Sequence, residues 1–562
     1  MKEPRQIRYR LFLLLCTWVL IQAVEAQDIS LEPVSQTYAI KNATIVQAPG
    51  RVIERGTVVV VDGVIKAVGK SVSIPANAQI IEADSMFVYS GFVSGLSHAG
   101  IPKPKDGRID RSKIKDPGNP PNALAGIQPN RLASEMLKPE DKSIKELADL
   151  GFAVAHTVPH GRMLPGQGAL ILLAGNSPDN MVYANQTSLF SQLSGARRMY
   201  PSTVIGVMAK YRDLYRKASQ SKDYLKRYNT NPSGMVRPEQ NFVEEAFYPI
   251  IDRKMPVAFK AESVLDIQRV LTLQADLGFN LLLGEVKQGW DIAEKIKSSN
   301  AKVFLSLDLP ELIKEKEDSA KSQTKTKFDL EKERLEKRKR EMVEKHYRQA
   351  ALLKDKGIKF GFSTLEVKAK DIRKNLSNLL DYGMSESDVL HALTVHPAEL
   401  LGLSNVMGTL EAGKMANLVI TDKPYLEEKS NVRHVMVGGY LRSFEVKKKK
   451  KKSMAEEEIK PEGKWSYTTE TLNGTVTGQI VLKESDGDYS GTISNSQTGD
   501  STELTEVLVN GNTLTLSFPF DMGGTNLQIK IDAEIDGETF EGNMSVGSFG
   551  SYEIDGQKEP EK

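Results

Sequence analysis

The chain has 562 residues, a formal net charge of +2, seven histidines and one cysteine. This length predicts more than one domain, and the near-zero charge provides no overall attraction for nucleic acid or for an anionic membrane. One cysteine excludes a disulfide framework and a cysteine-based zinc cluster, so a metal centre would have to use a large share of the histidines.

Residues 1–26 have the pattern of an export signal. Basic residues precede an apolar core over 11–21, and a small-residue cleavage site ends at Ala26. The apolar segment is too short for a stable membrane anchor. Leu15 precedes Cys16 where a lipoprotein signal normally has a small residue, so we do not expect lipid attachment. We predict an exported protein, periplasmic in a bacterium, that loses its cysteine on cleavage.

Two β-rich segments flank the centre of the chain. Short apolar runs separated by turns occupy residues 33–90, and the same texture returns over 405–446. We expect the two segments to pair in one small sheet.

Between these flanks, apolar strand runs alternate with amphipathic helices, as in parallel α/β folds. Residues 311–355 are highly charged, with acidic and basic residues three and four apart, which favours a long solvated helix or a hairpin. Too few heptad positions in this segment are apolar for a coiled coil. The expected strands are 153–158, 169–174, 256–260, 280–284, 302–307 and 358–363, and the expected helices include 264–277, 291–298 and 387–394.

The end of the chain differs in texture from the centre. Six consecutive lysines begin at Lys447 and are followed by an acidic run, which favours a linker over 447–462 rather than a nucleic-acid patch. Alternating strands with strong turns then predict a small antiparallel β-barrel or sandwich over 463–558. This domain has no histidine, so we expect a docking or stabilising role, with a small-ligand barrel as the other reading. The expected hairpin turns are 473–474, 486–487, 510–511 and 536–537.

Several short motifs are spread over about residues 36–446. They are Asn42-Ala43-Thr44-Ile45-Val46, Gly91-Phe92, Gly166-Gln167-Gly168-Ala169, His396-Pro397-Ala398, Leu401-Gly402-Leu403 and the run 408–422. Any one of them alone would be a weak signal, but together they resemble the amidohydrolase superfamily, in particular its imidazolonepropionase-like and dipeptidase-like branch. The resemblance implies a (β/α)8 TIM-like barrel over 91–404 and a small β-sandwich built from both flanks.

The resemblance also implies a chemistry, the hydrolysis of C–N bonds in amides, cyclic amides or dipeptides. Zinc or another divalent metal at the carboxyl ends of the barrel strands lowers the pKa of a bound water and polarises the substrate carbonyl. The family's usual ligands are a His-x-His pair after the first strand, two later histidines and an aspartate after the last strand.

Most of these ligand positions are changed in this chain. Read residue by residue, they carry Leu96, His98, Lys260, Glu285 and Leu365. Leucine cannot coordinate a metal and an ammonium group repels one, so we do not expect the ordinary metal centre. His98 and Glu285 remain as weak metal candidates. We further predict that Lys260 forms an ion pair with Glu285 near His98, with the ammonium in place of the missing metal ion.

Three functional hypotheses follow. The first is a pseudo-hydrolase that binds a ligand or a partner at the barrel mouth, the partner being an active amidohydrolase relative or a second copy. The alternative is an active amidohydrolase with a non-standard metal site around His98 and Glu285, acting on a small amide or peptide. His156 and His160 lie in a Pro-containing strand-end segment, where we expect hydrogen bonding rather than metal ligation. In a third reading the C-terminal β-domain is the functional module and the barrel is its support.

Overall fold

The computed structural model describes residues 36–104, 114–313, 327–444 and, with short breaks, 461–559. The predicted export signal, most of the predicted linker and residues 314–326 of the charged insertion lie outside this part. Contacts divide the chain into two units, Met1–Val446 and Lys447–Lys562, and each is described by itself. No helix among the described residues is both long and apolar enough to cross a membrane.

The two β-rich flanks form one eight-stranded sheet, in the order β16-β15-β14-β5-β1-β2-β3, with β4 paired to β1. The strands pack around an apolar core of their own to which both flanks contribute. The antiparallel pairing of β5 with β14, from Ser90 opposite Leu418 to Phe87 opposite Thr421, joins the two flanks. The strands are β1 (Thr37–Ala48), β2 (Arg51–Val61), β3 (Val64–Gly69), β4 (Gln79–Glu82), β5 (Phe87–Ser90), β14 (Leu418–Thr421), β15 (Val432–Val437) and β16 (Tyr440–Ser443).

A second eight-stranded sheet forms a nearly closed barrel, in the order β13-β12-β11-β10-β9-β8-β7-β6. Its two ends meet where the backbone N–H of Thr364 donates to the carbonyl of Leu96 at 2.9 Å. The strands are β6 (Phe92–Ser97), β7 (Phe152–Thr157), β8 (Gly166–Leu172), β9 (Val182–Gln192), β10 (Val257–Lys260), β11 (Leu281–Val286), β12 (Lys302–Ser306) and β13 (Phe360–Ser363). Each strand predicted over 153–363 is present, with small shifts at its ends.

Strand β8 departs from the expected (β/α)8 pattern, because it runs antiparallel to both β7 and β9. A parallel connection needs a crossover of a dozen or more residues. Residues 158–165 are too few for one, and 173–181 hold only the single turn of α5 (Pro178–Met181). The barrel therefore contains a three-stranded meander among otherwise parallel neighbours.

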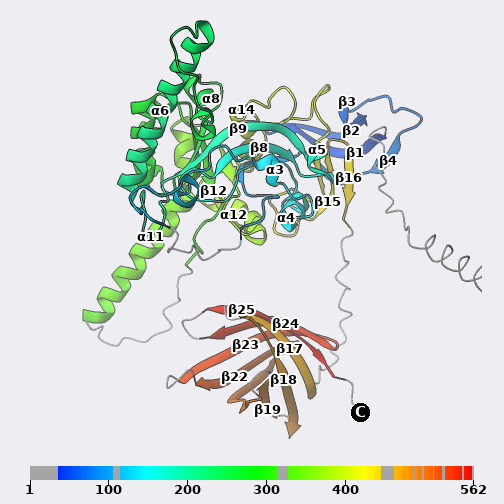
Figure 1. Cartoon of the computed structure of the whole chain (residues 1–562). Coiled ribbons are helices and arrows are strands. Elements are labelled where there is room, and N and C mark those ends of the chain that lie inside the picture. The colour runs from blue at the N-terminus through cyan, green and yellow to red at the C-terminus, as the bar shows by residue number, and fades with distance from the viewer. Residues whose placement is uncertain are drawn as a thin grey trace, which may run out of the picture. The chain divides into compact units, whose positions relative to one another are not determined.

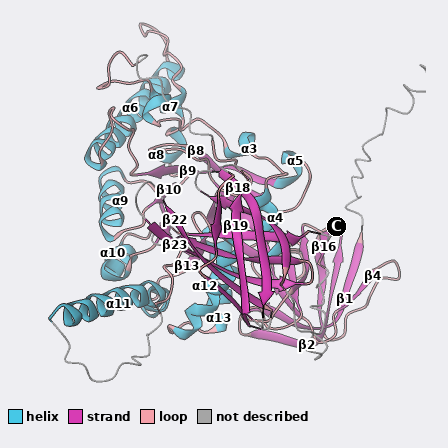
Figure 2. Ribbon diagram, turned by 90° about the horizontal axis from the view of Figure 1, so that it is seen from below, coloured by secondary structure: helices cyan, strands magenta, loops and turns pink. Residues whose placement is uncertain are grey.

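Helices cover the outside of the barrel, and in Figure 2 those that follow β9 to β13 run in a row around its strands. Helix α9 (Val264–Leu277) has the predicted bounds, because the Ser263 side chain caps its start and Gly278 ends it at φ 75°. The predicted long charged helix is α11 (Lys327–Asp355), which extends away from the barrel in a different direction from α6 (Val204–Thr230) (Figure 1). The others are α2 (Asn122–Ala125), α3 (Ala133–Met136), α4 (Lys142–Asp149), α7 (Phe242–Glu245), α8 (Tyr248–Ile251), η2 (Trp290–Ile292), α10 (Ala293–Ser298), α12 (Ala369–Asp381), α13 (Glu386–Leu393) and α14 (Val395–Leu400).

The second unit is one antiparallel sheet in the order β20-β19-β18-β17-β25-β24-β23-β22-β21. The strands on either side of each predicted turn pair in antiparallel register, and turn residues 473, 486, 487 and 511 lie outside the described residues. Among the described residues the ladder is open from β20 to β21, so the domain is a half-barrel rather than a closed barrel or a sandwich. Trp465 lies in its core. The strands are β17 (Gly463–Thr471), β18 (Gly474–Ser485), β19 (Asp488–Asn495), β20 (Ser501–Glu503), β21 (Glu506–Asn510), β22 (Thr513–Asp521), β23 (Asn526–Asp536), β24 (Thr539–Val546) and β25 (Ser551–Lys558).

Candidate functional site

The five residues at the predicted ligand positions all lie at the carboxyl ends of barrel strands. Leu96 and His98 are at the end of β6, Lys260 ends β10, Glu285 is near the end of β11, and Leu365 follows β13. Because these four strands run parallel and end at the same edge of the barrel, this mouth is where a site would be built.

Leu96 and Leu365 are buried in one apolar cluster inside the barrel mouth. The cluster also contains Phe304, and Leu96 is fully buried. A Cβ placed on Gly284 would lie 2.3 Å from Cδ2 of Leu96, which shows how closely the leucine packs against β11. Hydrophobic side chains therefore fill the space at two of the five positions. The other members of the cluster are Val158, Phe190, Ala258 and Leu282.

Glu285 is fully buried beneath the mouth. Its φ of 58° lies in the left-handed region, at a register shift between β11 and β12, so the strand bulges at this residue. The carboxylate accepts hydrogen bonds from the hydroxyls of Ser306 and, at 2.5 Å, Ser363. Burial raises the pKa of Glu285 to about 7, although the two serine hydrogen bonds act in the opposite direction. The group therefore holds a proton for part of the time at neutral pH.

The predicted ion pair between Lys260 and Glu285 is wrong. Nζ of Lys260 lies 2.5 Å from Oε1 of Glu366 and 3.4 Å from Oε2 of Glu262, and it has no carboxylate oxygen of Glu285 within 4 Å. The bulge directs Glu285 to the serines on the neighbouring strands, whereas Lys260 extends to the segments beyond the strand ends. Burial alone would lower the pKa of Lys260, but the hydrogen bond and charge of Glu366 raise it overall.

The ion pairs of Lys260 continue across the mouth. Nζ of Lys287 lies 3.0 Å from Glu262 and 2.6 Å from Asp308, so acids and bases alternate from Glu366 to Asp308. Burial opposes the positive charge of Lys287, but Asp308 and Glu262 outweigh it and raise its pKa above the usual range. Sequence reasoning missed Glu262, Lys287, Asp308 and Glu366. Each lies within three residues of a strand end, and that position was the available signal.

Two histidines stack at the mouth, with ring centroids of His98 and His160 3.7 Å apart. Nδ1 of His98 lies 2.7 Å from the carbonyl of Val158, and Nε2 of His160 lies 3.1 Å from that of Ile101. A carbonyl can only accept, so each of these nitrogens carries the proton. Burial, together with the neighbouring His160, lowers the pKa of His98 to about 3, and burial also lowers that of His160. Both rings are neutral at neutral pH.

His156 lies inside the barrel on β7 and is almost fully buried. Its Nδ1 donates to the carbonyl of Gly95 at 3.0 Å, and its Nε2 accepts from the hydroxyl of Ser188 at 2.9 Å. Burial lowers its pKa to about 4. Both ring nitrogens of His156 and one of His160 are thus occupied by hydrogen bonds, as the sequence predicted.

Comparisons with known proteins agree with this architecture. Residues 303–442 match the model of the amidohydrolase family. The structure of an amidohydrolase from Thermotoga maritima MSB8 aligns with a TM-score of 0.58, covering 72% of this chain and 99% of that chain at 22% identity. The chain thus has a segment similar to the amidohydrolase family and shares its fold with an amidohydrolase.

Other similar proteins are more distant or match over a shorter stretch. A putative prolidase from Bifidobacterium longum aligns with a TM-score of 0.42 at 16% identity, covering 73% of this chain and 95% of that chain. A putative N-acetylgalactosamine-6-phosphate deacetylase from Escherichia coli (strain K12) is 33% identical over 62 residues, which is 11% of this chain. The match spans only about a third, 34%, of that curated relative's length.

The residues at the five predicted ligand positions do not fit a divalent metal. The apolar side chains of Leu96 and Leu365 occupy two positions, and Lys260 brings a positive charge to a third. Glu285 is held by two serine hydroxyls and is partly protonated at neutral pH. In the described ranges, no group of three or more His, Cys, Asp or Glu side chains is placed to hold a metal ion.

Proposed function

We propose that this amidohydrolase-superfamily protein does not carry out the metal-dependent hydrolysis of C–N bonds typical of its family, and that it binds a ligand or a partner at the barrel mouth. The observation that carries this proposal is the burial of Leu96 and Leu365 in one apolar cluster at two ligand positions. A metal ion there would have to displace closely packed hydrophobic side chains.

The remaining groups at the mouth support the same proposal. Zinc sites use three or four nitrogen, sulfur or carboxylate ligands, and the partly protonated Glu285 is a poor one. Lys260 is held in its charged form by Glu366 and Glu262. Its positive charge opposes the binding of a cation at this place.

The charged residues at the mouth suit a polar ligand that carries one positive and one negative group. Three carboxylates and two ammonium groups alternate across it, from Glu366 through Lys260, Glu262 and Lys287 to Asp308. Such a pattern complements a ligand that carries an amino group and a carboxylate, and it steers recognition by charge. A dipeptide or the terminus of a protein partner has these groups.

Metal analysis combined with hydrolysis assays tests the proposal. We expect the purified full-length protein to contain far less than one zinc per chain and to leave N-acyl amino acids and dipeptides unhydrolysed, with or without added zinc. Stoichiometric zinc, together with activity that His98→Ala abolishes, would overturn the proposal in favour of a non-standard site at His98 and Glu285. His434→Ala, a histidine on β15 outside the barrel, is the matched control.

We also propose that the protein is exported and that it acts with a partner, either an active amidohydrolase relative or a second copy. The basic, apolar and small-residue pattern over 1–26 supports export. Expression in a bacterium with an intact-mass measurement tests this, because cleavage after Ala26 leaves Gln27 as the first residue. Light scattering after gel filtration tests the partner, and elution alone as a monomer at high concentration would contradict it.

A further inference from the structure

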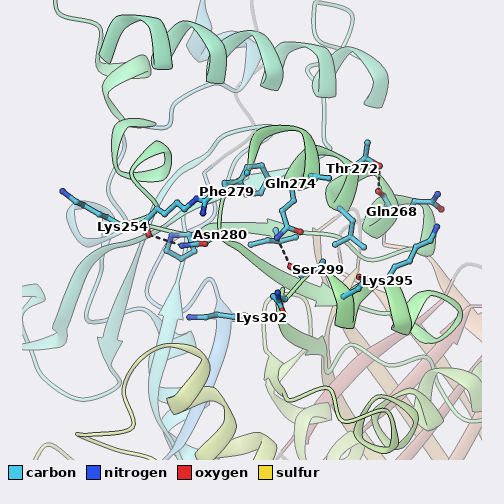
Figure 3. Close-up of a pocket in the computed structure, with 17 residues that line it drawn as sticks. Lys254, Gln268, Thr272, Gln274, Phe279, Asn280, Lys295, Ser299 and Lys302 are labelled. Carbon is cyan, nitrogen blue, oxygen red and sulfur yellow. Dashed lines mark hydrogen bonds between the residues drawn. The ribbon is translucent and has the colours of Figure 1, made fainter. Parts of the chain in front are cut away.

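A groove of about 970 Å³ lies at the opposite end of the barrel from the mouth, at the amino ends of the strands (Figure 3). Pro256 precedes β10, Leu281 begins β11 and Lys302 begins β12, and all three line it. The ends of helices α9 and α10 form its walls. This volume falls in the range of small-molecule sites.

The charged residues that line this groove are all basic. They are Arg253, Lys254, Lys295 and Lys302, without an aspartate or a glutamate. Lys254 lies 4.0 Å from Asp252, which already pairs with Lys222. For the other three, the described part of the chain places no carboxylate within 4 Å. The groove is therefore a local positive site on a chain with almost no net charge.

Helix ends alone do not explain these cations. The carboxyl ends of α9 and α10 attract positive charge, so basic residues are favoured there in any protein. Lys297 shows such a use at the carboxyl end of α11, because its Nζ donates to the carbonyl of Lys356 at 2.7 Å. In the described contacts, Arg253, Lys295 and Lys302 donate no such hydrogen bond to a backbone carbonyl. Their charges remain available to a ligand.

The walls between the cations carry amides and hydroxyls. The side chain of Gln274 donates to the carbonyl of Ser299 at 3.1 Å, and that of Asn280 donates to the carbonyl of Arg253 at 3.0 Å. The second bond holds the turn in which Arg253 has a φ of 58°. These contacts fix the floor of the groove, and the amide oxygens suit the hydroxyl groups of a polyol.

The cations lie at two ends of the groove. In Figure 3, Lys254 and Lys302 lie toward one end and Lys295 toward the other, with Gln274 and Ser299 between them. Partial burial lowers the pKa of Lys302, although the residue as a whole is exposed. We propose that the groove binds a small polyol that carries an oxyanion ester, phosphate or sulfate, at each of its two ends.

Calorimetric titration of the full-length protein with three probes tests the charge requirement. We expect fructose 1,6-bisphosphate to bind about tenfold more tightly than fructose 6-phosphate, because one charge-assisted contact is worth about that factor. Fructose itself should not bind measurably. A doubly sulfated sugar in a separate arm distinguishes sulfate from phosphate esters. Equal binding of fructose and its bisphosphate, or binding of none of the probes, overturns the proposal.

Substitutions at the two ends locate the site. Lys302→Gln and Lys295→Gln should each weaken the bisphosphate about tenfold, and the double variant should bind it no better than fructose. Lys297→Gln is the matched control, since it removes the same charge from α10 outside the groove lining. An equal loss in this control would show a general field effect and contradict the assignment.

A measurement on the unsubstituted protein guards against variants that fail to fold. Reaction with an acetylating reagent, followed by mass spectrometry, reports the exposure of each lysine. The bisphosphate should slow the acetylation of Lys295 and Lys302 several-fold and leave Lys297 unchanged. Protection of no groove lysine, with a titration that nevertheless shows binding, places the ligand elsewhere and overturns the proposal. The mouth takes no part in these readouts, so they stand or fall separately from the proposed function.

Discussion

The side chain of Leu96 lies directly over Gly284, so closely that a Cβ at position 284 would come within 2.3 Å of the leucine Cδ2. Leu96 is at a predicted ligand position, and Gly284 immediately precedes Glu285, which is at another predicted ligand position. The contact thus packs the side chain at one predicted ligand position against the strand residue next to another. Such close contacts are expected in a core whose interior is fully packed.

Truncation of Leu96 should destabilise the barrel. We expect Leu96→Ala to lower the free energy of unfolding by about 2–5 kcal/mol, because it leaves a cavity among fully buried side chains. Denaturant unfolding followed in the helical circular dichroism band measures it, since all described helices lie in the first unit. Leu265→Ala is the control, because Leu265 is 60% exposed on α9. An equally small loss of unfolding free energy in both variants would contradict the close packing of Leu96 and would indicate that it lines an open site.

The contact between Leu96 and Gly284 also predicts a coupling. Gly284→Ala should destabilise the barrel by about 1–3 kcal/mol, because its new methyl group collides with the leucine. In the Leu96→Ala background the same substitution should cost much less, since the space is then free. A double-mutant cycle by denaturant unfolding measures this difference. Additive effects of the two substitutions would show that the side chains do not meet in solution.

The buried carboxyl of Glu285 predicts a pH dependence of stability. Its folded pKa of about 7 lies above the usual 4.5, so the folded state holds the proton more tightly than the unfolded state. This contribution is fully present below about pH 4.5 and is lost as the pH rises through about 7. Relative to Glu285→Gln, the free energy of unfolding should fall by about 3 kcal/mol between about pH 5 and pH 8.

Denaturant unfolding of both proteins at several pH values measures this slope. Replacing Glu146, a glutamate that pairs with Lys142 on α4, with glutamine provides the control. A difference between wild type and Glu285→Gln that does not change with pH would contradict a proton held at Glu285.

Lys260 should be coupled to Glu366 more strongly than to Glu285. We expect the cycle of Lys260→Met with Glu366→Gln to give a coupling of about 0.5–1 kcal/mol, weakened by added salt. The cycle with Glu285→Gln should give a clearly smaller value, because the structure places no ion pair there. Thermal unfolding of the single and double variants gives both numbers. A larger coupling of Lys260 with Glu285 than with Glu366 would instead support the ion pair predicted from the sequence.

Local features of the fold could be predicted because local residues determine them. Helix α9 begins after Ser263 and ends at Gly278, and both residues act within one turn of the helix. Six of the eight barrel strands follow apolar runs long enough to be recognised, whereas β6 and β9 were not among the expected strands. The burial of Leu96 and Leu365 also agrees with the aliphatic character of their side chains. The same character means that neither side chain can be a metal ligand.

The direction of Glu285 could not be predicted in this way. A single residue at positive φ turns its side chain away from the regular alternation of a strand, and nothing in the local sequence signals it. The true partner of Lys260, Glu366, lies far along the chain beyond β13. Alignment to a family pattern places residues on strands, but it does not determine which way a bulged side chain points.

The antiparallel β8 and the basic groove were missed for different reasons. The connection 158–165 is short enough to indicate an antiparallel turn, but the family pattern suggested parallel strands throughout. The groove draws Arg253, Lys295 and Lys302 from three separate segments, and each alone is an ordinary exposed cation. Only the folded barrel brings them together.

The pairing of β5 with β14 has a consequence for biosynthesis. Leu418 must reach Ser90 before the flank sheet is complete, although the whole barrel lies between them in the chain. A nascent chain that ends before β14 leaves the edge of β5 without its partner, and an open strand edge invites pairing with other molecules. Contacts of such wide sequence separation also form slowly. Strands β14 to β16 therefore complete the flank sheet, and the first unit can finish folding only after they have left the ribosome.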